Sequence, residues 1–345
     1  MVQFLRMSGN KKLKLIDIKK IKTVPLAGRK SKVELDLSAA PARPGGSFMD
    51  FWNSLPGVLA ASNIKKVVEA VAAAREKDRP VVLGMGAHPI KVGLSPLIID
   101  LMRRGIITAV ATNGAAIVHD FELAYLGRTS EDVAEELCKG TFGMARETGL
   151  FLNRAIKNGA KKKLGLGQSI GALIGKSRFP FKGKSIFASG IELGLPVTVH
   201  VTMGADIIHM HPSADGASIG EASLRDFRLF ASVLSGLEGG VYINLGSAVV
   251  MPEVFLKALT VARNLGYPAR DITTVNMDFI QHYRPRENVL MRPTLGGGVS
   301  YALTGHHEIM FPLLAAGIIE RMAGKDRKRM TGGSGESRRD SKAEL

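Results

Sequence analysis

The sequence predicts an α/β fold whose parallel sheet is covered by helices on both faces. Short, nearly continuous apolar stretches, such as residues 79–84 and 240–245, are typical of strands buried on both faces. They alternate with longer segments that carry apolar residues at helical spacing, as residues 63–77 do. At 345 residues the chain is long enough for one large domain of this kind or for two modest ones.

The same patterns place each element along the chain. The predicted strands are residues 79–84, 106–112, 195–201, 240–245, 272–277 and 299–302. The predicted helices are residues 63–77, 96–104, 130–148, 222–235 and 252–265, with a short helix entered at 184–188. We expect Thr129 to cap the helix at 130–148, because a hydroxyl residue followed three positions later by an acid is a helix-start signature. Residues 206–210 fit either a short strand or a turn.

Composition divides the chain into three parts. Residues 1–46 are a lysine-rich arm ending in a stretch of Pro and Gly, which discourages regular structure. Residues 47–323 contain the alternating pattern and form the predicted α/β domain. Residues 324–345 have almost no apolar side chains, so we expect a disordered basic tail.

The net charge of +16 is concentrated in three segments. Residues 1–32 carry +9, residues 154–184 another +9 and residues 320–345 carry +3, which leaves −5 on the rest of the chain. Nucleic-acid-binding surfaces usually combine basic charge with stacking aromatic residues, and only Phe179 and Phe181 accompany the internal cluster. The pattern therefore favours solvated basic extensions over a nucleic-acid-binding surface.

The cysteine and apolar content predict a cytoplasmic protein. A single cysteine, Cys138, excludes an internal disulfide framework and suits a reducing compartment. No apolar run approaches the ~20 residues that cross a bilayer, and the N-terminal segment lacks the apolar core of a secretory signal. We expect Cys138 to be a buried or half-buried structural thiol within a helix.

Small and polar residues follow several of the predicted strands. Parallel sheets bind ligands outside the carboxyl ends of their strands, near the point where the strand order reverses. Small residues there let the pyrophosphate of a dinucleotide approach the main chain, although glycine also closes such turns in any fold of this class. The predicted cofactor-binding residues are Gly84, His88, Thr112, Asn113, Gly114, Gly246, Ser247 and Asp278.

Two glycine-containing stretches resemble known functional motifs, the dinucleotide-binding fingerprint and the nucleophile elbow, but neither match is complete. The dinucleotide fingerprint G-x-G-x-x-G is absent, because Pro89 stands at its last position after Gly84 and Gly86. Any nucleotide site is therefore not the ordinary Rossmann one. Residues 167–171 match the nucleophile elbow G-x-S-x-G, but the segment before them is a poor strand. A loop or helix start whose amides hold an anion is favoured over a serine hydrolase.

The histidines allow a metal site but do not favour one. His209 and His211 would share a face of a strand, with Asp206 and Asp215 nearby as further ligands. The Pro and Gly around them favour a loop, so we predict no metal. The histidine pair at 306–307 precedes a helical pattern and is expected to lie on the surface.

Residues 284–314 combine clustered charge with many Gly and Pro residues. Glu287 lies among Arg284, Arg286 and Arg292 in a stretch that we expect to be a loop. Loops held by a rigid scaffold are where chemistry usually takes place.

Several of these segments, in the same chain order, resemble the deoxyhypusine synthase family. The matching segments are residues 83–93, 111–127, 185–197, 245–250 and 284–314, within a likeness that extends over residues 50–320. The resemblance implies an NAD-binding fold with a parallel sheet, and homotetramers with sites at subunit interfaces. It also implies that NAD oxidises spermidine, that a lysine holds the aminobutyl group as an imine, and that an acceptor amine receives it. Glu287 matches a polyamine-binding carboxylate of the family, and Gly246 matches a cofactor-contacting glycine.

The chain departs from the family at the pocket. The family's catalytic lysine aligns with Pro293, beside Arg292, and an arginine stays protonated and cannot serve as the nucleophile. The family's tryptophan aligns with Met291, and a second substrate carboxylate aligns with His119. These changes predict a more basic pocket, which suits a less cationic or carboxylate-bearing substrate.

Two functions follow from the resemblance and its departures. The first is NAD-dependent chemistry on a small-molecule amine, with Glu287 holding the amine, His119 as acid or base and Arg292 as an anion clamp. The second is a non-catalytic or regulatory protein that keeps the nucleotide site. Transfer of an aminobutyl group is a weaker third option, which requires another lysine, Lys91 or Lys257, to replace the missing one.

Overall fold

The computed structural model describes residues 15–332, and the chain divides into two compact units, the first of which ends at Ser38. The described residues of the first unit form three short 3₁₀ turns without a buried residue: η1 (Ile18–Lys20), η2 (Leu26–Gly28) and η3 (Leu35–Leu37). The predicted arm includes residues 39–46, which belong to the second unit. There the Ala40 amide donates a hydrogen bond to the Ser54 carbonyl at 3.0 Å.

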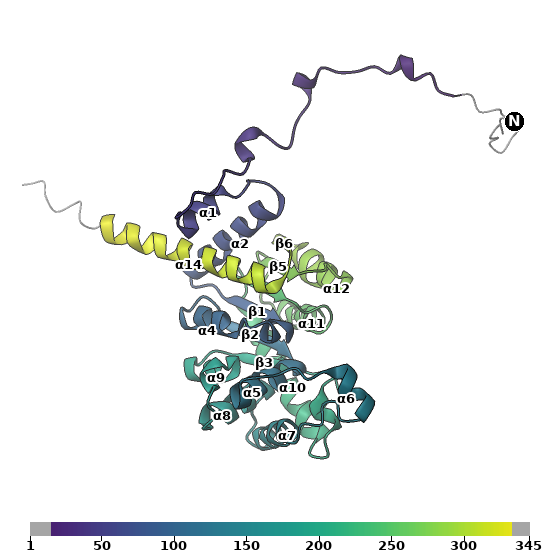
Figure 1. Cartoon of the computed structure of the whole chain (residues 1–345), viewed down its shortest axis with the longest axis vertical. Helices are drawn as coiled ribbons and strands as arrows, with labels where there is room; N and C mark the ends of the chain where they lie inside the picture. Colours follow the sequence, from purple (N-terminus) through teal and green to yellow (C-terminus); the bar gives the residue numbers. More distant parts are fainter. Residues whose placement is uncertain (1–14, 333–345) are drawn as a thin grey trace, which may run out of the picture. The chain divides into compact units, whose positions relative to one another are not determined.

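The described part of the second unit is built on six strands that pair only in parallel, in the order β3-β2-β1-β4-β5-β6. Figure 1 shows β5 and β6 toward one end of the sheet and β2 and β3 toward the other. The strands are β1 (Val81–Met85), β2 (Ala109–Asn113), β3 (Val197–His200), β4 (Val241–Leu245), β5 (Thr273–Asp278) and β6 (Val299–Thr304). The order reverses between β1 and β4, so the crevice expected to hold a ligand lies at the carboxyl ends of these two strands.

Helices cover both faces of the sheet, which confirms the predicted fold class. Successive residues of β1 belong to two separate apolar cores, Leu83 to one and Val82 to the other. The first core is packed by α2 (Leu59–Glu76), α4 (Ser95–Arg103), α5 (Gly114–Leu126), α7 (Arg146–Lys161), α8 (Leu166–Lys176), α9 (Ile186–Leu193) and α14 (His307–Gly332). The second is packed by α10 (Gly216–Ser235), α11 (Val250–Asn264) and the π-helical turn η6 (Arg286–Met291).

Shorter elements complete the described part of the second unit. They are α1 (Phe48–Ser54), α3 (His88–Lys91), α6 (Val133–Lys139), η4 (Lys182–Lys184), η5 (Ile207–Met210), α12 (Tyr283–Pro285) and α13 (Arg292–Thr294). No helix among the described residues is long and apolar enough to span a membrane. Helix α14 runs through residue 332, past the predicted start of the tail at 324, and residues 333–345 lie outside the described residues.

The predicted helix at 130–148 is two helices. Asp132, not Thr129, caps α6, because its Oδ1 accepts from the amides of Ala134 and Glu135. Gly140 has a φ of +70°, a conformation that ends a right-handed helix, and α7 begins only after it. In the short α6 that results, Cys138 is exposed, so its predicted burial is wrong.

The stretch from Arg284 to Thr294, predicted to be a loop, is helical in α12, η6 and α13. Pro293 has no amide hydrogen to donate, and it stands in the first turn of α13, where a helix needs none. The wider π-helical turn precedes it. Proline at such positions is compatible with helix, and this is why the Pro-rich composition was misleading.

The motif at residues 167–171 lies in the first turns of α8, which agrees with the predicted helix start. The group that its amides bind is not an external anion but the side chain of Asp226. The Oδ2 atom of Asp226 accepts from the Gly167 amide at 2.9 Å and from the Val199 amide at 2.8 Å. Burial raises the pKa of Asp226 to about 7, against the lowering effect of these hydrogen bonds. The start of α8 is therefore already satisfied and is not a site for an external anion.

Candidate functional site

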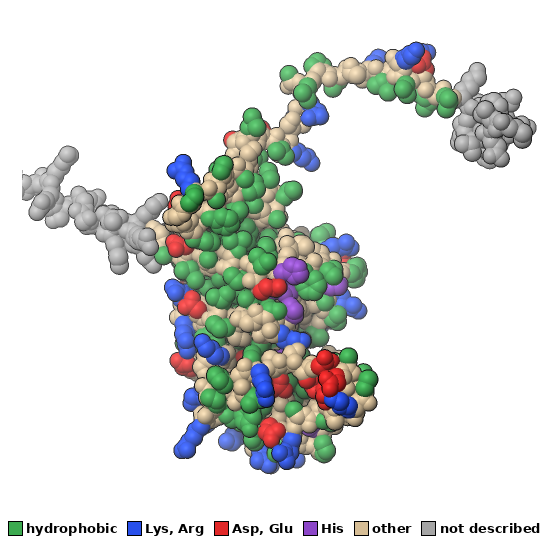
Figure 2. Space-filling view, in the orientation of Figure 1, with side chains coloured by type: hydrophobic (Ala, Val, Ile, Leu, Met, Phe, Trp, Pro, Cys, Tyr) green, Lys and Arg blue, Asp and Glu red, His purple; other side chains and the backbone are tan. Residues whose placement is uncertain are grey.

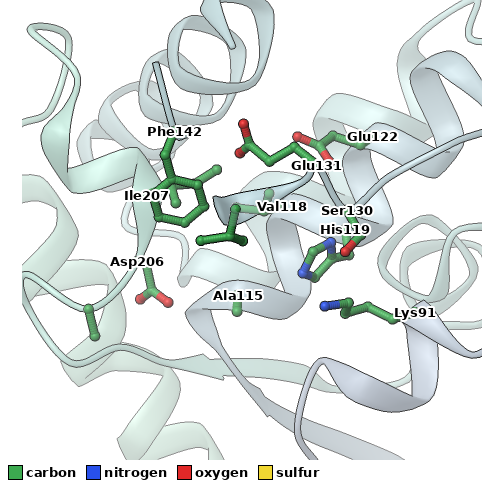
Figure 3. A pocket seen from close by; sticks show the side chains of 12 residues that line it. Lys91, Ala115, Val118, His119, Glu122, Ser130, Glu131, Phe142, Asp206 and Ile207 are labelled. Carbon is green, nitrogen blue, oxygen red and sulfur yellow. The ribbon is translucent and has the colours of Figure 1, made fainter. Parts of the chain in front are cut away.

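A pocket of about 240 Å³ lies where α5 leaves the carboxyl end of β2 (Figure 3). His119 and Glu122 face it from α5, Glu131 from the loop after α5, and Asp206 from the residue before η5. Lys91, the last residue of α3, completes the ionisable lining. Three carboxylates thus stand against one lysine, so the pocket is more acidic than the sequence predicts.

His119 is held by a chain of hydrogen bonds. Its Nδ1 lies 2.7 Å from the Thr129 hydroxyl, which donates to Glu122 Oε2 at 2.5 Å. The other oxygen of Glu122 accepts from the buried Thr148 hydroxyl at 3.0 Å. Two hydroxyl groups therefore fix Glu122, and Glu122 fixes His119 through Thr129.

The electrostatics of the pocket keep His119 neutral. Burial, and secondarily the charge of Lys91, lower the pKa of His119 to about 4. A neutral imidazole at physiological pH has one ring nitrogen free to accept a proton. His119 is therefore neutral and can accept a proton at physiological pH, although the same low pKa makes it a weak base.

One oxygen of the buried Asp206 side chain has no hydrogen-bond partner among the described residues. Asp206 is 8% exposed, and the oxygen without a partner is Oδ2. Burial raises the pKa of Asp206 to about 6. The carboxylate lies over the start of α5, where a Cβ on Gly114 would be only 2.0 Å from Oδ2. Gly114 thus makes room for Asp206.

The predicted cofactor residues at the ends of β1, β4 and β5 form a second cluster around His307. His307 is 1% exposed, which overturns its predicted surface position, whereas His306 is exposed. The His307 ring lies 5.3 Å from that of His88 between centroids, and its Nε2 is 3.6 Å from Asp278 Oδ1. The same ring covers Gly246, whose Cβ would be 2.6 Å from Cε1.

The remaining predicted cofactor residues differ in what surrounds them. A Cβ on Gly84 would be 2.1 Å from the Tyr242 hydroxyl, so this glycine accommodates a tyrosine in the core and does not face a ligand. The hydroxyl of Ser247 accepts from the Met251 amide at 3.1 Å and so serves α11. At the end of β2, Thr112 Oγ1 and Asn113 Oδ1 are buried without a partner among the described residues. The hydrogen-bonding capacity of these two buried oxygens is therefore unused.

These positions give a test of whether a dinucleotide fits. The oxygens of Thr112 and Asn113 lack a hydrogen-bond partner among the described residues, but both atoms are buried and are not open to NAD as the chain is folded here. The pyrophosphate does not fit over Gly114 or Gly246, because Asp206 fills the first position and His307 the second. The expected cofactor contacts at these two glycines therefore disagree with the structure as it stands.

Glu287 and Arg292 lie in a different part of the chain from the His119 pocket. Both belong to the helical stretch that packs against β5, β6 and α11. Glu287 is paired with Arg286 at 3.3 Å, and the Arg292 guanidinium donates to Asn288 Oδ1 at 2.6 Å. Neither residue lines the pocket. Within one chain, the three predicted catalytic residues do not form one site.

His209 in η5 and His211, which follows it, form hydrogen bonds with main-chain groups. His209 Nδ1 accepts from the Gly204 amide at 3.1 Å, and His211 Nε2 lies 2.8 Å from the Gly143 carbonyl. Among the described residues no three His, Cys, Asp or Glu side chains are grouped as a metal ion would need.

Sequence reasoning missed Glu122 and Glu131, and it gave Thr129 and Asp206 other roles. Glu122 was recognisable, because it follows His119 by three positions on a helix and so shares its face. Asp206 follows the predicted strand at 195–201, so a parallel sheet places it at the same edge as Gly114, but the sequence does not indicate that it covers the start of α5.

A buried, unpaired carboxylate should make stability depend on pH. The pKa of Asp206 is about 6 in the folded chain, above the 3.8 of a free aspartate. The stabilisation that comes from holding the proton is thus present below pH 3.8 and lost as the pH rises through 6. We expect Asp206→Asn to stabilise the protein by about 2 kcal/mol at pH 8 and by little at pH 4.

Urea denaturation of both proteins at the two pH values measures this difference. Asp100→Asn is the matched control, because Asp100 forms an exposed ion pair with Arg104 that should contribute little at either pH. Equal stability of wild type and Asp206→Asn at pH 8 would show that the carboxylate has a partner after all.

Comparisons with known proteins identify the fold. No protein-family model matches the chain, and no characterised sequence does. The structure is similar to that of a protein from Entamoeba histolytica assigned as a deoxyhypusine synthase, with a TM-score of 0.51 and 14% identity over 82% of this chain and 96% of that one. A LOR/SDH-type protein of Methanococcus maripaludis S2 has a TM-score of 0.47 at 17% identity, covering 77% of this chain and 71% of that one.

A third similar structure belongs to a much longer protein. The cyanobacterial arginine dihydrolase ArgZ has a TM-score of 0.47 at 13% identity over 76% of this chain, which spans only 33% of ArgZ. At these identities, likeness is evidence of architecture and not of activity. The chain has a deoxyhypusine-synthase-like α/β fold with an all-parallel, six-stranded sheet.

Proposed function

We propose that the pocket around His119 binds a small cationic amine and that the chain is an enzyme acting on it. The observation that carries this proposal is the unpartnered, buried carboxylate of Asp206 on the pocket wall. An unpaired buried charge is costly and is retained where a ligand supplies the partner. A primary ammonium group is such a partner, because it combines a positive charge with three donors.

The surroundings of the pocket favour the same ligand. Glu122 and Glu131 add two further carboxylates to its lining. Figure 2 shows acidic side chains gathered over α6, where Asp132 and Glu135 are exposed beside Val133, which lines the pocket. Acidic walls attract cations and raise their local concentration. We therefore propose a cationic substrate in place of the less cationic one that the sequence predicts.

His119 gives the pocket its chemistry. An amine reacts only after its ammonium form has lost a proton, and neutral His119 lies in the pocket to accept that proton. Lys91 has two opposite effects: its positive charge lowers the pKa of a bound ammonium group, and it also lowers the pKa of His119. The roles are thus anchoring of the cation by Asp206 and removal of a proton by His119.

More finely, we propose NAD-dependent dehydrogenation of, or aminoalkyl transfer from, a polyamine or an amino-acid-like amine. Support comes from the deoxyhypusine-synthase-like fold. When bound, NAD would supply an acceptor for hydride. Its phosphates would have to lie away from Gly114 and Gly246.

The separation of the predicted catalytic residues supports an oligomeric site. Glu287 and Arg292 do not line the pocket of their own chain. In a homotetramer with sites at subunit interfaces, as the sequence resemblance implies, these residues would reach the pocket of a neighbouring copy. There Glu287 would bind a distal amino group, and Arg292 would bind a carboxylate of the substrate.

The alternative is a protein that binds a nucleotide without turnover. The loss of the lysine nucleophile at Pro293 favours it. The two proposals differ in whether bound NAD is reduced.

Incubation of the full chain with NAD and a panel of amines, from monoamines to spermidine and basic amino acids, separates these possibilities. Appearance of NADH absorbance with one class of amine supports the enzyme. Calorimetric binding of NAD without reduction by any amine supports the non-catalytic alternative. Amine binding without NAD binding would exclude NAD as the cofactor and leave the proposed amine-binding pocket supported. Failure of every amine to bind would overturn the proposal.

A further inference from the structure

We propose that Thr129 is a positioning residue that, with Glu122, fixes the tautomer of His119 so that Nε2 is the proton acceptor. Its catalytic meaning rests on the proposed function, because only an enzyme needs a base. The tautomer itself is a property of the chain alone, so it can be measured without a substrate.

The direction of the hydrogen bonds follows from counting protons. Thr129 has one hydroxyl proton, and it donates this proton to the Glu122 carboxylate oxygen 2.5 Å away. The other oxygen of Glu122 accepts from the Thr148 hydroxyl. Thr129 Oγ1 then has only lone pairs to offer Nδ1 of His119 at 2.7 Å, so Nδ1 carries the hydrogen.

The neutral state of the ring completes the argument. A neutral imidazole has one hydrogen, and with that hydrogen on Nδ1 the Nε2 atom is a free acceptor. Carboxylate and hydroxyl groups that orient a histidine from one nitrogen are a general means of preparing the other nitrogen for proton transfer. The chain Glu122–Thr129–His119 has this form.

Backbone strain in the loop after α5 is independent support for a positioning role of Thr129. Ser130, which follows Thr129 and lines the pocket, has a φ of +72° although it is not glycine. That conformation costs about 1–2 kcal/mol and persists only where neighbouring contacts impose it. Thr129 is held by Glu122, and Glu131 accepts from the Gly143 amide at 2.9 Å, so the strained residue is fixed on both sides. Such strain is typical of segments that position functional groups.

Nitrogen NMR of the full chain with ¹⁵N-labelled histidine tests the inference. His119→Ala assigns the signals of His119. At pH 7 the wild type should show a protonated Nδ1 and a bare Nε2. Thr129→Val, which removes the hydroxyl, should give a mixture of tautomers and lower kcat roughly tenfold at a nearly unchanged KM. Thr129→Ser keeps the hydroxyl and should restore both.

The chain offers a matched control. Thr141 donates to Glu136 at 2.5 Å on the exposed side of α6, without a histidine, so Thr141→Val should leave the His119 signals unchanged. A protonated Nε2 in the wild type, or an unchanged tautomer in Thr129→Val, would overturn the inference. The wild-type spectrum decides this even if Thr129→Val does not fold. Absence of amine turnover alongside the expected spectrum would count against the proposed function only.

Discussion

Replacing His119 by alanine is expected to lower kcat for the amine reaction by roughly 10²–10⁴-fold, because the variant lacks the group that accepts the proton. The pKa of His119 is about 4, so the wild-type base is neutral at pH 7 and needs no deprotonation of its own. The amine should still bind, since Asp206 and Glu131 are unchanged. Steady-state kinetics with calorimetric affinities would separate the two effects.

His306→Ala is the control for this measurement. His306 is exposed, and its nearest acidic atom, on Glu308, is 3.9 Å away. The substitution should therefore leave kcat unchanged. Activity in His119→Ala within a few-fold of wild type would show that another group, such as Lys91, removes the proton.

The second large effect concerns the fold. Gly167→Ala is expected to destabilise the chain by about 3 kcal/mol, because the new Cβ would lie 1.8 Å from the Val197 carbonyl oxygen. The start of α8 would have to leave β3, and the hydrogen bond from the Gly167 amide to Asp226 would be weakened with it. Denaturant unfolding measures the loss.

Gly175→Ala, in the same helix, should have the opposite effect. A Cβ at Gly175 meets nothing within 4 Å, and alanine favours helix over glycine by about 0.5–1 kcal/mol. If both variants were destabilised alike, the close approach of α8 to β3 would not be the cause.

The sheet could be predicted from the sequence because its signal is local. The strand Val81–Met85 is a short apolar run buried along its whole length, and such a run needs no information from distant residues. The predicted loop at Arg284–Thr294 failed because proline in a first helical turn looks like proline in a loop. The predicted single helix at 130–148 failed because the left-handed Gly140 received no weight as a helix end.

The candidate site could be predicted only in part, because its parts meet in three dimensions. His119 was identified because it aligns with a substrate-binding carboxylate of the family that the sequence resembles. Its partner Thr129 was instead predicted to cap a helix. Asp206 joins the site from the segment between β3 and η5. Gly114 accommodates the Asp206 carboxylate, whereas the sequence suggested that this glycine left room for a phosphate. A glycine indicates that something approaches closely, and it does not indicate what.

The central claim is that the Asp206 carboxylate binds the cationic group of a ligand. Calorimetric titration of a short diamine into the full chain at pH 8 tests this most directly. Removal of a buried charge that pairs with the ligand should weaken binding, so Asp206→Asn should raise Kd roughly 10–100-fold. Asp100→Asn, at an exposed ion pair, should leave Kd unchanged. Equal affinity of wild type and Asp206→Asn for the diamine would contradict the account.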